Sequence, residues 1–92
     1  MKRDEILDLA KEYITVDRAA THGEAEDLFG SIAAGWQWWM EIRPSGPMTS
    51  FDVAMMMDIF KTARAASNPK HMDNFCDKVG YSAIAGEIAA KG

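Results

Sequence analysis

The chain has 92 residues, of which 48% are apolar, and its formal net charge is −4. This length fits one domain, and an acidic chain lacks the basic surface needed to bind the backbone of DNA or RNA. The basic residues at the N-terminus precede no apolar run, and no stretch reaches the roughly 20 apolar residues of a membrane span. We therefore expect neither a secretion signal nor a membrane helix.

The spacing of apolar residues predicts an all-α fold of about four antiparallel helices, in a single domain over residues 1–92. The first helix is expected over residues 3–15 and the second over 24–42, with a connection over 16–23. The second helix carries one broad apolar stripe, made of Leu28, Phe29, Ile32, Ala33, Trp36, Trp39 and Met40.

Turn residues and caps delimit the other two helices. A turn with two prolines at 44–47 precedes a third helix, which starts with the capping box Thr49-Ser50-Phe51-Asp52 and ends near Ser67. Its core face is expected to hold Val53, Met56, Met57 and Phe60. Asn68 and Pro69 suit the cap and the first position of a fourth helix that runs to about Ala90.

The fourth helix is apolar on two faces. One face holds Met72, Phe75, Cys76, Val79 and Ala83, and the other holds Tyr81, Ile84 and Ile88. A helix of this kind is typical of the centre of a bundle or of a dimer. We therefore expect a homodimer or a higher oligomer, whose contacts complete the small bundle.

Two acids of the fourth helix fall where a core is expected. Asp73 and Asp77 lie one turn apart and align with Gly80 and Ile84 rather than with the solvent-facing Asn74, Lys78 and Ser82. They form either internal salt bridges or, with Glu24 and Glu26, a site for Mg²⁺, which prefers carboxylate oxygens. The acids near the start of the second helix can also simply complement the helix dipole.

The third helix supplies cations for the same region. Arg64 continues its apolar row and Lys61 is adjacent, so each needs an anionic partner, either a carboxylate or a phosphate. We expect Arg64, Asp73 and Asp77 to share one polar pocket between the third and fourth helices. Arg18 and His22, in the connection, are further candidates for phosphate contacts.

Trp38 lies outside the apolar stripe of the second helix. An aromatic side chain in that position anchors a protein interface, stacks on a nucleotide base, or is simply exposed. We favour the interface. Cys76 is the only cysteine, which excludes an intrachain disulfide and suits a reducing cytoplasm.

Residues 22–29, 52–57, 61–64 and 68–81 resemble a family of small phage and prophage proteins, known as a domain of unknown function. This resemblance implies expression in the cytoplasm of a bacterial host. A more distant one is to the MazG and dimeric dUTPase group of all-α nucleotide pyrophosphohydrolases, which hold magnesium through Glu-x-x-Glu and Glu-x-x-Asp motifs. Asp73 and Asp77 match neither motif, because three residues separate them.

Two functional hypotheses follow. In the first, the chain handles nucleotides, either as a Mg²⁺-dependent pyrophosphohydrolase or as a binder without catalysis, and whether it is an enzyme stays open. In the second, it is a non-enzymatic phage accessory protein that binds a host protein or a copy of itself. There the charged residues form internal salt bridges.

Overall fold

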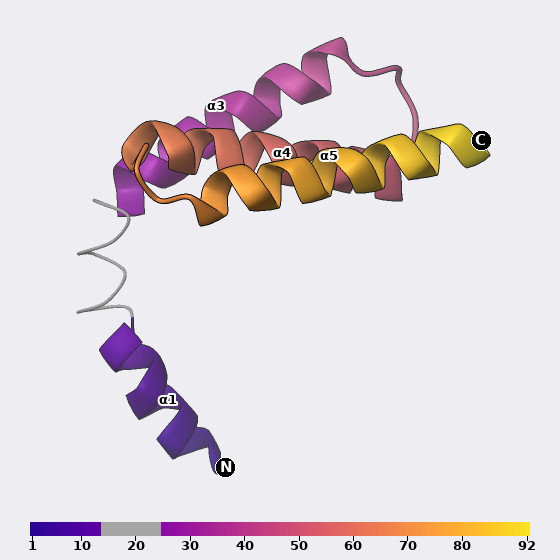
Figure 1. The fold of residues 1–92 in the computed structure, drawn as a ribbon. Coiled ribbons are helices and arrows are strands. Elements are labelled where there is room, and N and C mark those ends of the chain that lie inside the picture. Colours follow the sequence, from indigo (N-terminus) through magenta and orange to yellow (C-terminus); the bar gives the residue numbers. More distant parts are fainter. Residues whose placement is uncertain (14–24) are drawn as a thin grey trace.

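The computed structural model describes residues 1–13 and 25–92 of the chain. In these ranges every regular element is a helix: α1 (Arg3–Glu12), α3 (Ala25–Ile42), α4 (Ser50–Ser67) and α5 (Asp73–Lys91) (Figure 1). The all-α prediction is confirmed. The predicted connection at 16–23 and the end of the first predicted helix lie outside the described ranges. None of the described helices combines the length and the apolar character that crossing a membrane requires.

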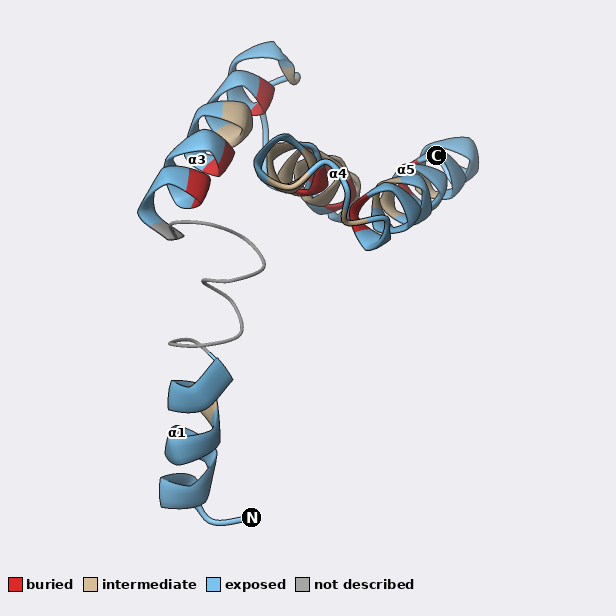
Figure 2. Cartoon of the chain, turned by 60° about the vertical axis from the view of Figure 1, so that its left-hand side comes forward, coloured by how far each residue is buried: buried red, intermediate tan, exposed pale blue. Residues whose placement is uncertain are grey.

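The central helix is α4, which packs against α3 on one side and α5 on the other. Figure 2 shows the buried residues of α3 and α5 on the sides turned toward α4. Of the two positions expected for the fourth predicted helix, α5, the centre of the bundle is therefore wrong for the described chain, where α4 is central, and the centre of a dimer stays a prediction. The reason is that α4 is enclosed by two neighbours, so most of its side chains are half-buried, whereas α5 has one neighbour.

The contact between α3 and α4 rests on a narrow row of side chains. Leu28, Ile32 and Trp39 are buried, whereas Phe29 and Met40 are exposed, so the predicted stripe of α3 is broader than the observed one. In the middle of the contact the helices approach closely at Gly35. A Cβ atom at Gly35 would lie 2.5 Å from Cγ2 of Ile59.

The predicted start of the fourth helix needs correction. Asn68 ends α4, since its N–H donates to the carbonyl oxygen of Arg64 at 2.9 Å, and α5 begins only at Asp73. Pro69 and Lys70 form the turn between them. The chain must reverse direction here to lay α5 against α4, and the fixed φ angle of proline suits a turn as well as a first helical position.

The orientation of α5 also differs from the prediction. Asn74, expected to face solvent, is 1% exposed and fully buried against α4, as is Ala85. Lys78, expected to face solvent, is half-buried, as are Tyr81 and Ile88. These five positions recur at intervals of three and four residues, which defines one helix face. The opposite face is exposed.

Helix α1 has no buried residue. Its apolar side chains Ile6 and Leu7 are exposed, and so is Tyr13, which directly follows the helix.

Candidate functional site

A buried carboxylate fixes the corner between α3 and α4. Asp52 accepts hydrogen bonds from Nε of Arg43 at 2.7 Å, from Nε1 of Trp39 at 3.0 Å and from the backbone N–H of Thr49 at 2.8 Å. The Thr49 hydroxyl accepts in return from the N–H of Asp52, which completes the predicted capping box. This cluster positions the two helices that carry the cleft described below.

The electrostatics of this corner follow from its donors. The Arg43 guanidinium, together with the backbone and hydroxyl donors of Thr49 and the Trp39 indole, holds the pKa of the Asp52 carboxyl well below its usual range. Arg43 also donates to the carbonyl oxygens of Gly46 and Pro47 in the turn. Because its donors and acceptors satisfy one another, we assign this cluster a structural role.

Charged side chains line the seam between α4 and α5. Nζ of Lys61 lies 2.8 Å from a carboxylate oxygen of Asp77, and Lys78 pairs with Asp58. The first pair joins position 61 to 77 and the second joins 58 to 78, as expected for neighbouring antiparallel helices. The same register sets Arg64 opposite Asn74. We call these six residues, which are Asp58, Lys61, Arg64, Asn74, Asp77 and Lys78, the α4–α5 seam.

Two features of the seam are unusual. Lys61 is buried with its ammonium 5.4 Å from the ring centre of Phe60, and the Arg64 guanidinium lies 5.3 Å from the same ring. Both distances suit cation–π contacts. The buried Nδ2 of Asn74 has no hydrogen-bond partner within the described part of the chain. A buried N–H group without an acceptor is costly, so it marks a place where an acceptor would be favourable.

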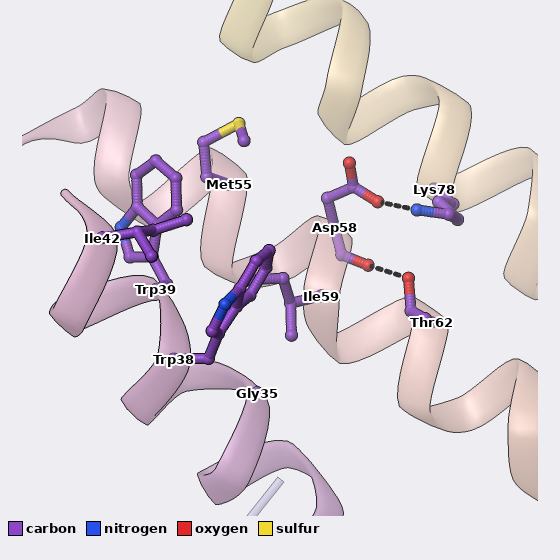
Figure 3. Close-up of a pocket in the computed structure, with 9 residues that line it drawn as sticks. All are labelled: Gly35, Trp38, Trp39, Ile42, Met55, Asp58, Ile59, Thr62 and Lys78. Atoms are coloured by element: carbon purple, nitrogen blue, oxygen red, sulfur yellow. Dashed lines mark hydrogen bonds and ion pairs between the residues drawn. The ribbon is translucent and has the colours of Figure 1, made fainter.

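An apolar cleft opens between α3 and α4 and reaches the α4–α5 seam at one end (Figure 3). Its volume is about 470 Å³, and its lining comes mainly from α3 and α4: Gly35, Trp38, Trp39, Ile42, Met55, Asp58, Ile59, Thr62 and, from α5, Lys78. Trp38 is 57% exposed and stands at this cleft beside Ile59. The Asp58–Lys78 pair gives the cleft one polar end, which adjoins the seam.

The seam brings together some of the predicted site residues and leaves others apart. Asp77 does meet α4, but through Lys61 rather than Arg64, and its side chain is 47% exposed. Asp73 is 83% exposed and lies 3.9 Å from His71, so the predicted pocket of Arg64, Asp73 and Asp77 is not formed. The reason is the rotation of α5, which turns Asn74 rather than Asp73 toward α4.

The predicted metal ligands are only partly described. Asp73 and Asp77 lie one turn apart on α5, and Glu26 is exposed on α3, whereas Glu24 lies outside the described residues, as do Arg18 and His22. Among residues 1–13 and 25–92, no three carboxylate, histidine or cysteine side chains are grouped so that they could hold a metal ion. The magnesium site stays a prediction.

Four polar residues with a role in the structure were missed by sequence reasoning. Arg43 gave no signal beyond its place beside a turn, and Asp58 was not singled out. Asn74 and Lys78 looked solvent-facing because they are polar. The available signal was their spacing with Tyr81 and Ala85, which places all four on one face of α5.

Comparison with known proteins identifies the family of this chain. The family model of a domain of unknown function, DUF6378, matches residues 5–89. The chain belongs to this family. It is also 34% identical to the Gene 55 protein of Mycobacterium phage L5 over 79 residues, which cover 86% of the chain and 49% of that protein. The chain thus spans about half the length of this relative. No solved structure matches.

This DUF6378 chain therefore has a phage relative, and its family has no assigned activity. The resemblance to small phage proteins of unknown function is confirmed. The more distant resemblance to all-α nucleotide pyrophosphohydrolases stays a prediction, and so do the roles of the individual site residues.

Proposed function

We propose that this DUF6378 chain is a phage protein that handles nucleotides by binding their phosphate groups at the α4–α5 seam. The observation that supports the proposal is the pairing of two donors there. Lys61 is a buried cation whose carboxylate partner is half-exposed, and the amide N–H of Asn74, one turn before that partner, lacks an acceptor. Phosphate oxygens accept from both kinds of donor.

The chemistry of the seam sets the conditions for binding. Asp77 already neutralises Lys61, so a phosphate group must either displace this carboxylate or share the cation with it. A Mg²⁺ ion held by Asp77 would reduce its negative charge and favour the phosphate. Asp73, one turn earlier, is the second predicted ligand. For hydrolysis, Asp73 and Asp77 would hold the metal, which would supply activation of the attacking water, and Lys61 and Arg64 would hold the phosphates.

The test is a thermal-shift series with nucleoside triphosphates and with inorganic triphosphate, each with and without Mg²⁺. At 100 times its dissociation constant, a ligand adds about 2.7 kcal/mol to the free energy of unfolding. For a domain of this size we expect Tm to rise by roughly 10 °C or more. Product analysis of the same mixtures distinguishes binding from hydrolysis.

Lys61→Met is expected to abolish this shift, because methionine retains the packing against Phe60 and removes the charge. The matched control is Lys91→Met, since Lys91 is largely exposed near the C-terminal end of α5. The proposal fails if no nucleotide or inorganic triphosphate raises Tm of the unaltered chain. It also fails if Lys61→Met responds as strongly as Lys91→Met.

A second candidate function, a non-enzymatic accessory protein that binds another protein, is favoured by the apolar cleft. Trp38 exposes a large aromatic surface beside it, as interface anchors do. Trp38→Ala separates this role from base stacking. If Trp38→Ala keeps the nucleotide-induced shift in Tm, the cleft is available to bind a protein. If Trp38→Ala loses the shift, Trp38 stacks on the nucleotide base.

A further inference from the structure

The outer face of α5 carries an apolar stripe without charges. At about 100° per residue, its side chains fall within an arc of about 100° on the side turned away from α4. Val79 is 70% exposed, and its neighbours in the stripe are exposed as well. The members are Met72, just before the helix, and Phe75, Cys76, Val79, Ala83, Gly86 and Ala90. We call this set the α5 stripe.

The charged residues of α5 avoid the stripe. Asp73, Asp77, Glu87 and Lys91 all lie beyond one of its edges, and Lys78 faces α4. Exposed apolar surface of this extent and continuity on one helix is unfavourable in water, because burying it gains about 25 cal/mol per Å². We therefore expect another apolar surface to pack against the α5 stripe.

The order of residue sizes along the stripe indicates which partner surface fits against it. Large side chains occupy its first half and small residues its second half. An antiparallel copy of α5, related by a two-fold axis between Val79 and Ala83, sets each large residue against a small one. The resulting pairs are Met72 with Ala90, Phe75 with Gly86, and Val79 with Ala83. Such alternation lets two helix surfaces interlock.

Gly86 supports this arrangement. A Cβ atom at Gly86 would meet nothing within 4 Å, so no contact within residues 1–13 and 25–92 explains a residue that weakens the helix. In the antiparallel pair its missing side chain leaves the space that Phe75 of the second copy fills. A two-fold contact uses the same surface on both partners, which is what a self-complementary stripe provides.

The large side chains at the start of the stripe are exposed in the single chain. Met72 is 60% exposed and Phe75 43%. Packing them against a second copy removes them from water, which is favourable in proportion to the apolar area buried.

From these observations we infer that the α5 stripe is the dimer interface of this protein, with a second copy of the chain as its occupant and the two α5 helices antiparallel. This inference does not rest on the proposed phosphate site, which uses the opposite face of α5. The two therefore fail independently.

The test is sedimentation velocity across a range of concentrations. We expect the unaltered chain to be a dimer at high micromolar concentration. Val79→Glu should weaken the dimer at least about tenfold, because it places an unpaired charge in the contact. The matched control is Ile84→Glu, since Ile84 is half exposed on α5 but lies off the stripe. This control should remain dimeric.

Gly86→Leu provides a second variant that spares the fold. Leucine favours the helix and meets open space in the single chain, but it fills the position that Phe75 of the second copy requires. Circular dichroism should show an intact helical fold, while sedimentation shows a weakened dimer. A bis-maleimide should cross-link the exposed Cys76 residues of two copies in the Ile84→Glu control and not in Val79→Glu.

Several results would overturn the inference. A monomeric unaltered chain at high micromolar concentration means that no second copy covers the stripe. A dimer that survives both Val79→Glu and Gly86→Leu places the contact elsewhere. If Trp38→Ala dissociates the dimer while Val79→Glu does not, the contact lies on the cleft face of α3 rather than on α5.

Discussion

Replacing Gly35 by alanine is expected to destabilise the chain, whereas the same replacement at Gly30 is expected to stabilise it. Both glycines lie inside α3, so alanine removes the same conformational freedom from the unfolded chain at each. They differ in their surroundings. A Cβ atom at Gly30 meets nothing within 4 Å, but at Gly35 it lies 2.5 Å from Cγ2 of Ile59.

The expected magnitudes follow from these distances. Alanine in place of glycine inside a helix gains about 0.5–1 kcal/mol, which is the whole effect at Gly30. Forcing an extra methyl group into a packed contact costs about 1–3 kcal/mol. The branched side chain of Ile59 offers no flexible end that can move away. The net expectation for Gly35→Ala is a loss of about 1 kcal/mol.

The assay is thermal unfolding of the two variants at one protein concentration, because the proposed dimer would make Tm depend on concentration. Since 1 kcal/mol corresponds to about 4–8 °C in a domain of this size, we expect the two Tm values to differ by at least about 4 °C. Ile59→Leu removes Cγ2 and should relieve the loss in the double variant with Gly35→Ala. Equal stability of the two glycine variants would refute the close approach of α3 and α4.

Three further predictions concern single contacts. The pKa of the Asp52 carboxyl is lower in the folded chain than its usual value of about 4, so the ionised carboxylate stabilises the fold above that pH. This contribution is lost as pH falls toward the folded-state pKa. Asp52→Asn should therefore be less stable at neutral pH and lack this acid dependence in urea titrations. Trp36→Phe removes a 2.7 Å hydrogen bond to the carbonyl oxygen of Met56 and should cost about 0.5–1.5 kcal/mol in thermal melts. Asp77→Ala should cost more than the about 1 kcal/mol of an exposed pair, because it leaves the buried Lys61 ammonium without its carboxylate; a smaller loss would show that water already screens the pair.

Local signals predicted the helices well. The start of α4 was readable because Thr49 and Asp52 satisfy each other's backbone groups within one turn, whatever the rest of the chain does. The turn before α4 was readable from its two prolines and from Gly46, whose φ of 136° suits glycine. Such features depend on neighbours in sequence, which the sequence displays directly.

The arrangement of the helices was harder to predict. Helix α5 has two apolar faces, and its own residues do not say which one meets α4. Residue type alone would bury Phe75 and expose Asn74, whereas the structure does the reverse. The same rotation explains why Lys61 rather than Arg64 pairs with Asp77. Charge type predicted that cations of α4 would meet acids of α5, but only the rotation and register decide the pairs.

The packing of α3 and α5 against α4 has a consequence for folding kinetics. The extensive contacts in the described chain join helices that follow each other in sequence, α3 with α4 and α4 with α5. Chains dominated by such local contacts fold quickly, on the microsecond-to-millisecond scale of helical bundles. Association of two copies into the proposed dimer would depend on concentration and be slower. During synthesis, the concentration of the chain rather than its folding rate would then determine when such a dimer forms.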